Sequence, residues 1–149
     1  MKNPNNSLTE SALGIFEEGF SCSQSVLAAF CETCDLDRNT ALKLADGFGG
    51  GMGHMALTCG AVTGGIMVIG LKHGRRSTSD SSSKEKTVTL VREFMRGFNG
   101  RNGSTDCRDL LGCNISTDGG YAHAHEHNLF HTICPKYVRD AVEILEELL

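Results

Sequence analysis

The stretch GFGGGMGHMALTCGAVTGGIMVIG, residues 47–70, decides how this chain folds. Its first part, 47–53, holds five glycines in seven residues. Glycine is used where the backbone needs a positive φ or where another group must approach it closely. From Cys59 onward the residues are small and apolar, and Thr58 precedes them as a candidate N-cap. The stretch therefore predicts a glycine loop that leads into a buried helix with Cys59 in its first turn.

The position of Cys59 has two interpretations. A thiol in the first turn of a helix lies near unpaired N–H groups and the positive end of the helix dipole. Both favour the thiolate, which is the nucleophilic and metal-binding form of cysteine. The alternative is that Cys59 is a small buried apolar residue, as free cysteines often are.

Size and composition indicate a single domain over residues 1–149, large enough for a hydrophobic core. A formal net charge of −4 without a basic block argues against nucleic acid as a partner. The longest apolar run, 59–71, is too short to span a bilayer, so direct membrane insertion is not expected. The N-terminal sequence MKNPNNSLTESAL lacks the layout of a signal peptide, which predicts a cytoplasmic location.

Hydrophobic periodicity predicts an all-α domain of about six helices. Helices are expected at 8–19, after Ser21, at 38–46, after Thr58, at about 83–99, after Asp106 and from Cys134 onward. We expect a bundle-like arrangement around the buried Gly/Ala-rich helix that begins near Cys59. Segment 114–133 has little periodicity and is expected to be a polar loop.

Seven cysteines are many for a chain of this length, and in a reducing compartment structural disulfides are not expected. Four of them fall at predicted helix starts: Cys22, Cys59, Cys107 and Cys134. If these starts converge, the pKa values of all four thiols would fall together, giving either a reactive thiol centre or a cage of thiolate ligands. By contrast, Cys31 and Cys34 form a C-x-x-C pair on an apolar stripe without a second pair to complete a zinc site, which favours core packing.

The tract HAHEHNLFH carries His123, His125, His127 and His131. If this part is helical, His127 and His131 share one face and could bind a transition metal ion. The alternative, which the lack of periodicity favours, is a polar surface loop with clustered histidines.

The four cysteines also carry a family resemblance. Cys22 lies in GFSCSQSVL, Cys59 opens the C-G-A-x-x-G sequence CGAVTG, Cys107 lies in STDCRDLLG and Cys134 opens CPKYVRDAVEIL. Over roughly residues 10–149, the chain resembles the C_GCAxxG_C_C family of small redox-active proteins.

This resemblance implies a helical redox protein in which the four cysteines are both the catalytic and the cofactor-binding groups. The family domain is also similar to part of the split-Soret cytochromes, in which cysteines hold an iron–sulfur cluster. No C-x-x-C-H sequence is present, so covalent haem attachment is not expected. Members are often encoded near transporter genes, which implies a redox partner in a membrane transporter system.

Three classes of function therefore compete. The first is a cytoplasmic redox protein whose four-cysteine centre either ligates an iron–sulfur cluster or cycles between dithiol and disulfide. The second is a zinc- or copper-handling protein associated with transport, without redox turnover. The third is an interaction module with purely structural cysteines. Whether the chain is an enzyme stays open, as does a homodimer formed through the histidine tract or the glycine loop.

Overall fold

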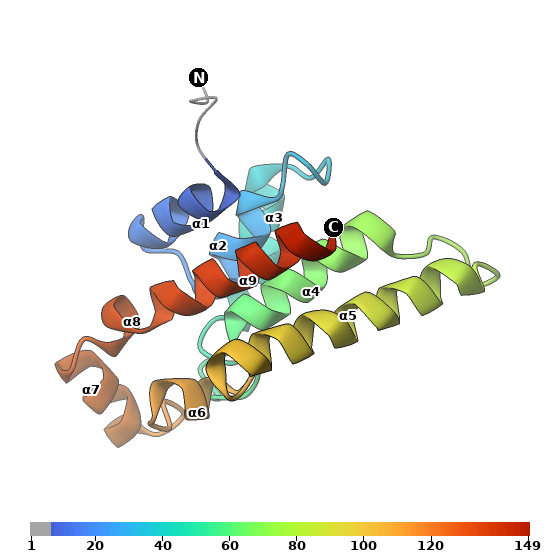
Figure 1. Ribbon diagram of the computed structural model, residues 1–149. Coiled ribbons are helices and arrows are strands. Elements are labelled where there is room, and N and C mark those ends of the chain that lie inside the picture. Colours follow the sequence, from blue (N-terminus) through green and yellow to red (C-terminus); the bar gives the residue numbers. More distant parts are fainter. Residues whose placement is uncertain (1–6) are drawn as a thin grey trace.

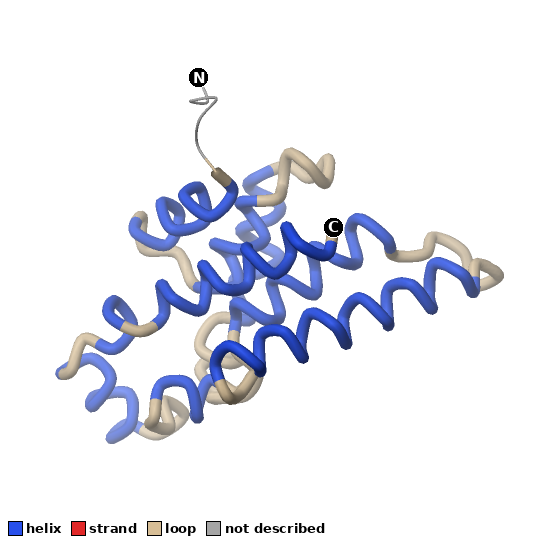
Figure 2. The backbone as a smooth tube through the Cα atoms, viewed as in Figure 1, coloured by secondary structure: helices blue, strands red, loops and turns tan. Residues whose placement is uncertain are grey.

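The computed structural model describes residues 7–149, which are mostly helical and contain no β-strand (Figure 2). The helices are α1 (Leu8–Glu17), α2 (Cys22–Ala29), α3 (Arg38–Ala45), the 3-10 turn η1 (Asp46–Phe48), α4 (Gly60–His73), α5 (Ser81–Asn102), α6 (Cys107–Leu111), α7 (Asp118–Glu126), α8 (Leu129–Thr132) and α9 (Cys134–Leu148) (Figure 1). The predicted all-α class is confirmed. Residues 1–6, part of the segment from which the cytoplasmic location is predicted, lie outside the described residues.

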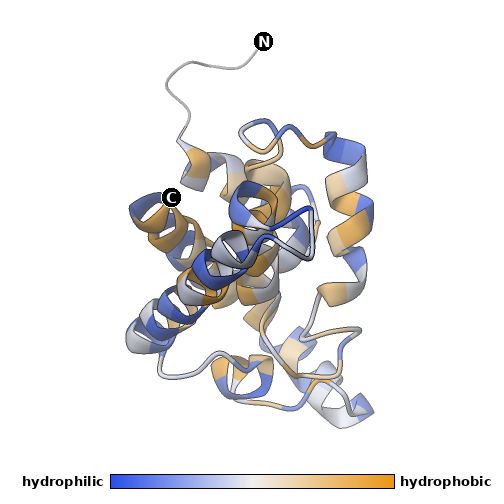
Figure 3. Cartoon of the chain, turned by 90° about the vertical axis from the view of Figure 1, so that its right-hand side faces the viewer, coloured by the Kyte–Doolittle hydropathy of each residue, from blue (hydrophilic) through white to orange (hydrophobic). Residues whose placement is uncertain are grey.

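Two helices hold the centre of the molecule. The Gly/Ala-rich helix α4 packs against α2, α5 and α9, and α2 packs in turn against α1, α3, α4 and α9. Figure 1 shows α4, α5 and α9 running side by side, and Figure 3 shows the hydrophobic residues gathered between the helices. The bulkiest core side chains are Phe30, Phe94 and Phe98, each at most 2% exposed. The core is therefore organised around α2 as much as around α4.

Glycines in α4 let α2 approach very closely. A Cβ atom at Gly64 would lie only 2.8 Å from the carbonyl oxygen of Ser23, and one at Gly60 would lie 2.9 Å from the backbone nitrogen of Ser23. On the opposite side, a Cβ at Gly65 would overlap the ring of Phe94. The glycines of the CGAVTGG sequence thus have a packing role, because they bring the start of α2 against the start of α4.

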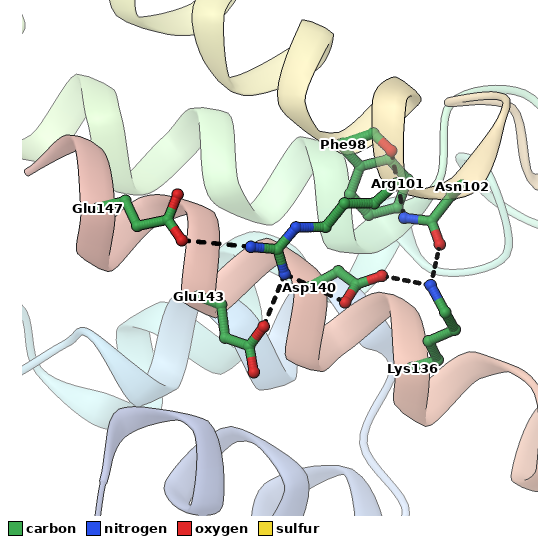
Figure 4. A network of polar contacts seen from close by, with 7 residues as sticks. All are labelled: Phe98, Arg101, Asn102, Lys136, Asp140, Glu143 and Glu147. Atoms are coloured by element: carbon green, nitrogen blue, oxygen red, sulfur yellow. Dashed lines mark hydrogen bonds and ion pairs between the residues drawn. The ribbon is translucent and has the colours of Figure 1, made fainter.

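A polar network fastens α5 to α9 (Figure 4). Arg101 of α5 forms ion pairs with Glu143 at 2.6 Å and with Asp140 at 3.4 Å. Asp140 is buried, and Lys136 also pairs with it at 2.6 Å. A buried carboxylate is tolerated only when it is paired, so Arg101 and Lys136 together explain how Asp140 can lie inside.

The structure corrects two features of the predicted organisation. The helix expected after Ser21 ends at Ala29, so the C-x-x-C pair lies in the turns that follow it. Segment 114–133, expected to be a loop, contains α7 and α8, which raises the number of helices above the expected six or so. Thr117 caps α7 by accepting a hydrogen bond from the N–H of Gly120 at 3.0 Å, a local signal that the absence of apolar periodicity concealed.

Among the described residues, no helix combines the length and the apolar composition that crossing a bilayer would require.

Candidate functional site

Four helix starts meet at one cavity of about 650 Å³. Cys22, Cys107 and Cys134 are the first residues of α2, α6 and α9, and all three line this cavity together with Cys59. Cys59 itself is the N-cap of α4, so the helix begins one residue later than the sequence indicates with Thr58 as the cap. The sequence analysis could not show whether these four helix starts converge, and the structure shows that they do.

The start of α2 is held by a capping box. The Ser21 hydroxyl accepts a hydrogen bond from the N–H of Gln24, and the Gln24 side chain accepts one from the N–H of Ser21 at 3.0 Å. The amide of Gln24 also donates to the carbonyl oxygen of Leu42 at 2.9 Å. These bonds fix the first turn of α2, and with it Cys22.

A backbone clip joins the starts of α4 and α6. The N–H of Cys59 donates to the carbonyl oxygen of Thr105 at 2.8 Å, and the N–H of Cys107 donates to that of Leu57 at 2.6 Å. The bonds flank a single antiparallel bridge between Thr58 and Asp106. Because both cysteines use their own backbone in the clip, Cys59 and Cys107 are held on facing segments.

Tyr137 connects the other pair of helices. Its hydroxyl donates to the carbonyl oxygen of Leu110 at 2.7 Å. Tyr137 lies one turn after Cys134 in α9, and Leu110 lies three residues after Cys107 in α6. The bond therefore keeps the starts of α6 and α9 in register across the cavity.

The glycine loop forms part of the cavity rim in an unusual conformation. Five consecutive residues, 50–54, have positive φ, including the non-glycine residues Met52 (φ 66°) and His54 (φ 60°). A residue with a side chain costs roughly 1–2 kcal/mol in this left-handed conformation. The ring of His54 stacks on Tyr121 of α7, with the centroids 5.5 Å apart. The loop and α7 thus meet at the cavity through this pair.

The Cys22 and Cys134 thiols shift each other's pKa in opposite directions. Side-chain hydrogen bonding towards Cys134 raises the pKa of Cys22 well above its usual range, and burial together with the neighbouring thiols raises it further. The same interaction lowers the pKa of Cys134, although burial opposes the change. Cys134 thus loses its proton at lower pH than Cys22.

The other two thiols behave in the opposite way to Cys134. Burial raises the pKa of Cys59 to about 12, even though the N–H groups of Ala61 and Val62 act against it. Burial, and then the thiols around it, raise the pKa of Cys107 to about 12. The prediction that convergence lowers all four pKa values is therefore wrong. Loss of water raises the pKa values of Cys59 and Cys107, and the interaction with Cys134, followed by burial, raises that of Cys22.

We expect the pH dependence of alkylation to separate these thiols. The thiolate is the reactive form, so a lowered pKa makes Cys134 react at lower pH, whereas Cys59 and Cys107 stay protonated until strongly alkaline pH. The protein is treated with iodoacetamide at about neutral pH, roughly pH 6 to 8, and the modified cysteines are identified by peptide mapping. Cys134 should be modified at least about tenfold faster than Cys59 or Cys107. Equal rates at these three cysteines would contradict the lowered pKa of Cys134.

Cys31 and the two histidines predicted to bind a metal ion do not form one site with the four cavity cysteines. Cys31 is buried in the main core, as predicted for packing, and outside the cavity. His131 lines the cavity, whereas the ring of His127 lies tilted by 33° against that of His123, with the centroids 4.2 Å apart. The chain leaves the helical path at Asn128, which has φ 54°. The continuous helix on which the shared face of His127 and His131 depended is therefore absent.

Four cysteine thiolates are the ligand set that iron–sulfur clusters use, so the donor set at the cavity fits a cluster. Over residues 7–149, however, no three His, Cys, Asp or Glu side chains are grouped as they would be around a metal ion. Binding a cluster or a metal ion at Cys22, Cys59, Cys107 and Cys134 would require these side chains to draw together. The predicted cofactor stays a prediction.

Comparison with protein families identifies the chain. The model of the family described as "Putative redox-active protein (C_GCAxxG_C_C)" matches residues 20–148. The chain belongs to this family. The resemblance inferred from the cysteine motifs is thus confirmed, and the four motif cysteines of this C_GCAxxG_C_C protein are the four that line its cavity. No curated protein and no solved structure matches the chain.

Sequence reasoning missed several residues at the site of this C_GCAxxG_C_C protein. The role of Gln24 could have been predicted from the sequence, because S-x-x-Q before an apolar run is the pattern of a capping box. No sequence pattern predicts the contacts of Tyr137, His54 and Tyr121, because their partners lie far away in the chain.

Proposed function

We propose that this member of the C_GCAxxG_C_C family is a cytoplasmic redox protein in which Cys22 and Cys134 cycle between dithiol and disulfide. The observation that carries the proposal is that these two thiols line one cavity where four helix starts converge, and that they shift each other's pKa in opposite directions. Exchange chemistry needs one attacking thiolate and one nearby thiol that resolves the intermediate.

The two thiols have distinct roles in this proposal. Cys134, whose pKa is lowered, is the attacking group, and Cys22, whose pKa is raised, holds the proton until it resolves the intermediate. Oxidation joins the two sulfur atoms and releases two electrons and two protons to an acceptor. Cys59 and Cys107, kept protonated by burial, surround the pair without exchanging themselves.

A second candidate is an iron–sulfur protein in which all four cysteines are ligands. It is favoured by the number of thiols, because exchange requires two and the cavity is lined by four. Such a cluster would supply one-electron transfer. The helix starts would then stabilise its negative charge, as they do for other anions.

One experiment separates the two candidates. Protein purified without oxygen is examined for visible absorption, iron and sulfide, and its free thiols are then counted before and after mild oxidation. We expect a colourless protein that loses two thiols per chain reversibly, with the disulfide mapped to Cys22 and Cys134. A broad band at roughly 400 nm with iron and sulfide would support the cluster instead. Zinc or copper without sulfide, and no reversible thiol loss, would favour the metal-handling class.

A further inference from the structure

The cavity is larger than a pair of reacting thiols requires. Its volume of about 650 Å³ lies in the range that small-molecule sites occupy, which is roughly 300–1,000 Å³. Four cysteines line it. Aromatic residues from four separate parts of the chain line it as well: Phe16, Phe20, Tyr121, Phe130 and Tyr137. Several aromatic rings in the lining of one cavity favour a ligand that is itself flat and apolar.

Over the part of the chain that the structure describes, the cavity has no lysine or arginine with which an anionic ligand could pair. Among the described residues that line it Asp46 is the one carboxylate, so only the backbone N–H groups at the helix starts would favour an anion. The raised pKa values of Cys59 and Cys107 keep these two thiols uncharged at neutral pH. A disulfide such as oxidised glutathione, with its several carboxylates, would find no lysine or arginine among these lining residues, whereas an uncharged molecule needs no such partner.

The rim offers hydrogen-bond donors. His125 and His131 line the cavity, and among the described residues neither imidazole ring has a hydrogen-bond partner, although both backbones bond to Asn128. His125 lies against the edge of Tyr121, with ring centroids 4.7 Å apart, and of Phe130, at 5.5 Å. An imidazole N–H beside aromatic rings can donate to an acceptor atom on the edge of a bound ring.

From these three observations we propose that the cavity binds an uncharged, flat compound of the quinone class, which accepts the electrons of the Cys22–Cys134 dithiol. This inference rests on the proposed dithiol function. In the reaction two S–H bonds break and one S–S bond forms. The two electrons and two protons convert the two carbonyl groups of the quinone into the two hydroxyl groups of the hydroquinone.

The test uses tetramethyl-1,4-benzoquinone, because its four methyl groups hinder direct addition of thiols to the ring. The fully reduced protein is mixed with the quinone without oxygen, and loss of quinone absorbance and formation of the Cys22–Cys134 disulfide are followed. We expect a rate that saturates with quinone concentration and exceeds the rate with dithiothreitol, at equal thiol concentration, by at least about tenfold. Oxidised glutathione should react more slowly than the quinone.

Two wall variants test the aromatic site itself. Phe130→Ala and the milder Tyr121→Leu should each lower kcat/KM for the quinone about two- to tenfold, the usual range for loss of one ring contact. Leu71→Ala, an exposed position in the last turn of α4, is the matched control and should change nothing. Oxidation by diamide, a small reagent that needs no binding site, should stay within about twofold of the parent in Leu71→Ala, and the diamide rate of each wall variant is the reference against which its quinone rate is compared.

The outcomes distinguish the two proposals. If diamide oxidises the Cys22–Cys134 pair but the quinone reacts no faster than with dithiothreitol, or more slowly than oxidised glutathione, the quinone site is overturned and the dithiol function stands. If diamide forms no Cys22–Cys134 disulfide, the dithiol function is overturned and the quinone proposal with it. Unchanged quinone kinetics in both wall variants would also overturn the site.

Discussion

Cys134→Ser is expected to abolish reversible oxidation of the protein, whichever chemistry the centre uses. Serine cannot form a disulfide with Cys22, and it does not replace a thiolate as a soft ligand. Thiol counting should therefore show no reversible loss of thiols, where the parent loses two. A nucleophilic thiol and its partner thiol act together, so removing either one removes the activity of both. The rate at which the protein reduces an electron acceptor should therefore fall at least about a hundredfold.

The control for this substitution is Cys34→Ser. Cys34 is half-buried against the main core and lies outside the cavity. The variant should keep the parent's reversible oxidation, and both variants should keep the helical circular dichroism. Parent-like oxidation in a folded Cys134→Ser protein would remove the basis for placing the redox centre at the cavity.

Gly64→Ala is expected to lower the free energy of unfolding by about 1–3 kcal/mol, the usual cost of overpacking a close contact. The added methyl group would meet the carbonyl oxygen of Ser23 at 2.8 Å and the Cβ of Val26 at 3.2 Å. A backbone carbonyl cannot rotate away as a side chain can, so α2 must shift outward. Because α2 begins with Cys22, the same variant should also oxidise more slowly.

Gly70→Ala is the matched control, six residues further along the same helix. A methyl group at Gly70 meets no heavy atom within 4 Å. It should therefore raise the free energy of unfolding by about 0.5–1 kcal/mol, through the lower conformational entropy that alanine has in the unfolded chain. Urea denaturation followed by circular dichroism measures both changes. Equal stability of the two variants would mean that the close approach of α2 to α4 is not needed for folding.

Much of the local structure could be read from short sequence windows. Ser21 and Asp37 cap α2 and α3 as expected, and Gly112 ends α6 with φ 71°. These features depend on residues within one helical turn, so neighbouring letters are sufficient to predict them. The same reasoning failed for segment 114–133, because α7 buries little apart from Ala124 and so has almost no apolar stripe to recognise.

The candidate site was predictable in its membership but not in its chemistry. The four cysteines could be selected because each stands at a helix start and matches a family motif. Their pKa values could not be predicted, since a thiol's pKa depends on how much water it loses and which thiol it meets. Cys22 and Cys134 are 112 residues apart in the chain and nevertheless line the same cavity and shift each other's pKa.

Residue order thus sufficed for the helical class, the helix starts and the choice of Cys22, Cys59, Cys107 and Cys134, because caps and periodicity are short-range properties. Three-dimensional packing decided which of these thiols meet, which one has a lowered pKa, and that aromatic rings and histidines share their cavity. The physical reason is that burial and side-chain pairing are set by segments distant in sequence, here α2, α4, α6 and α9.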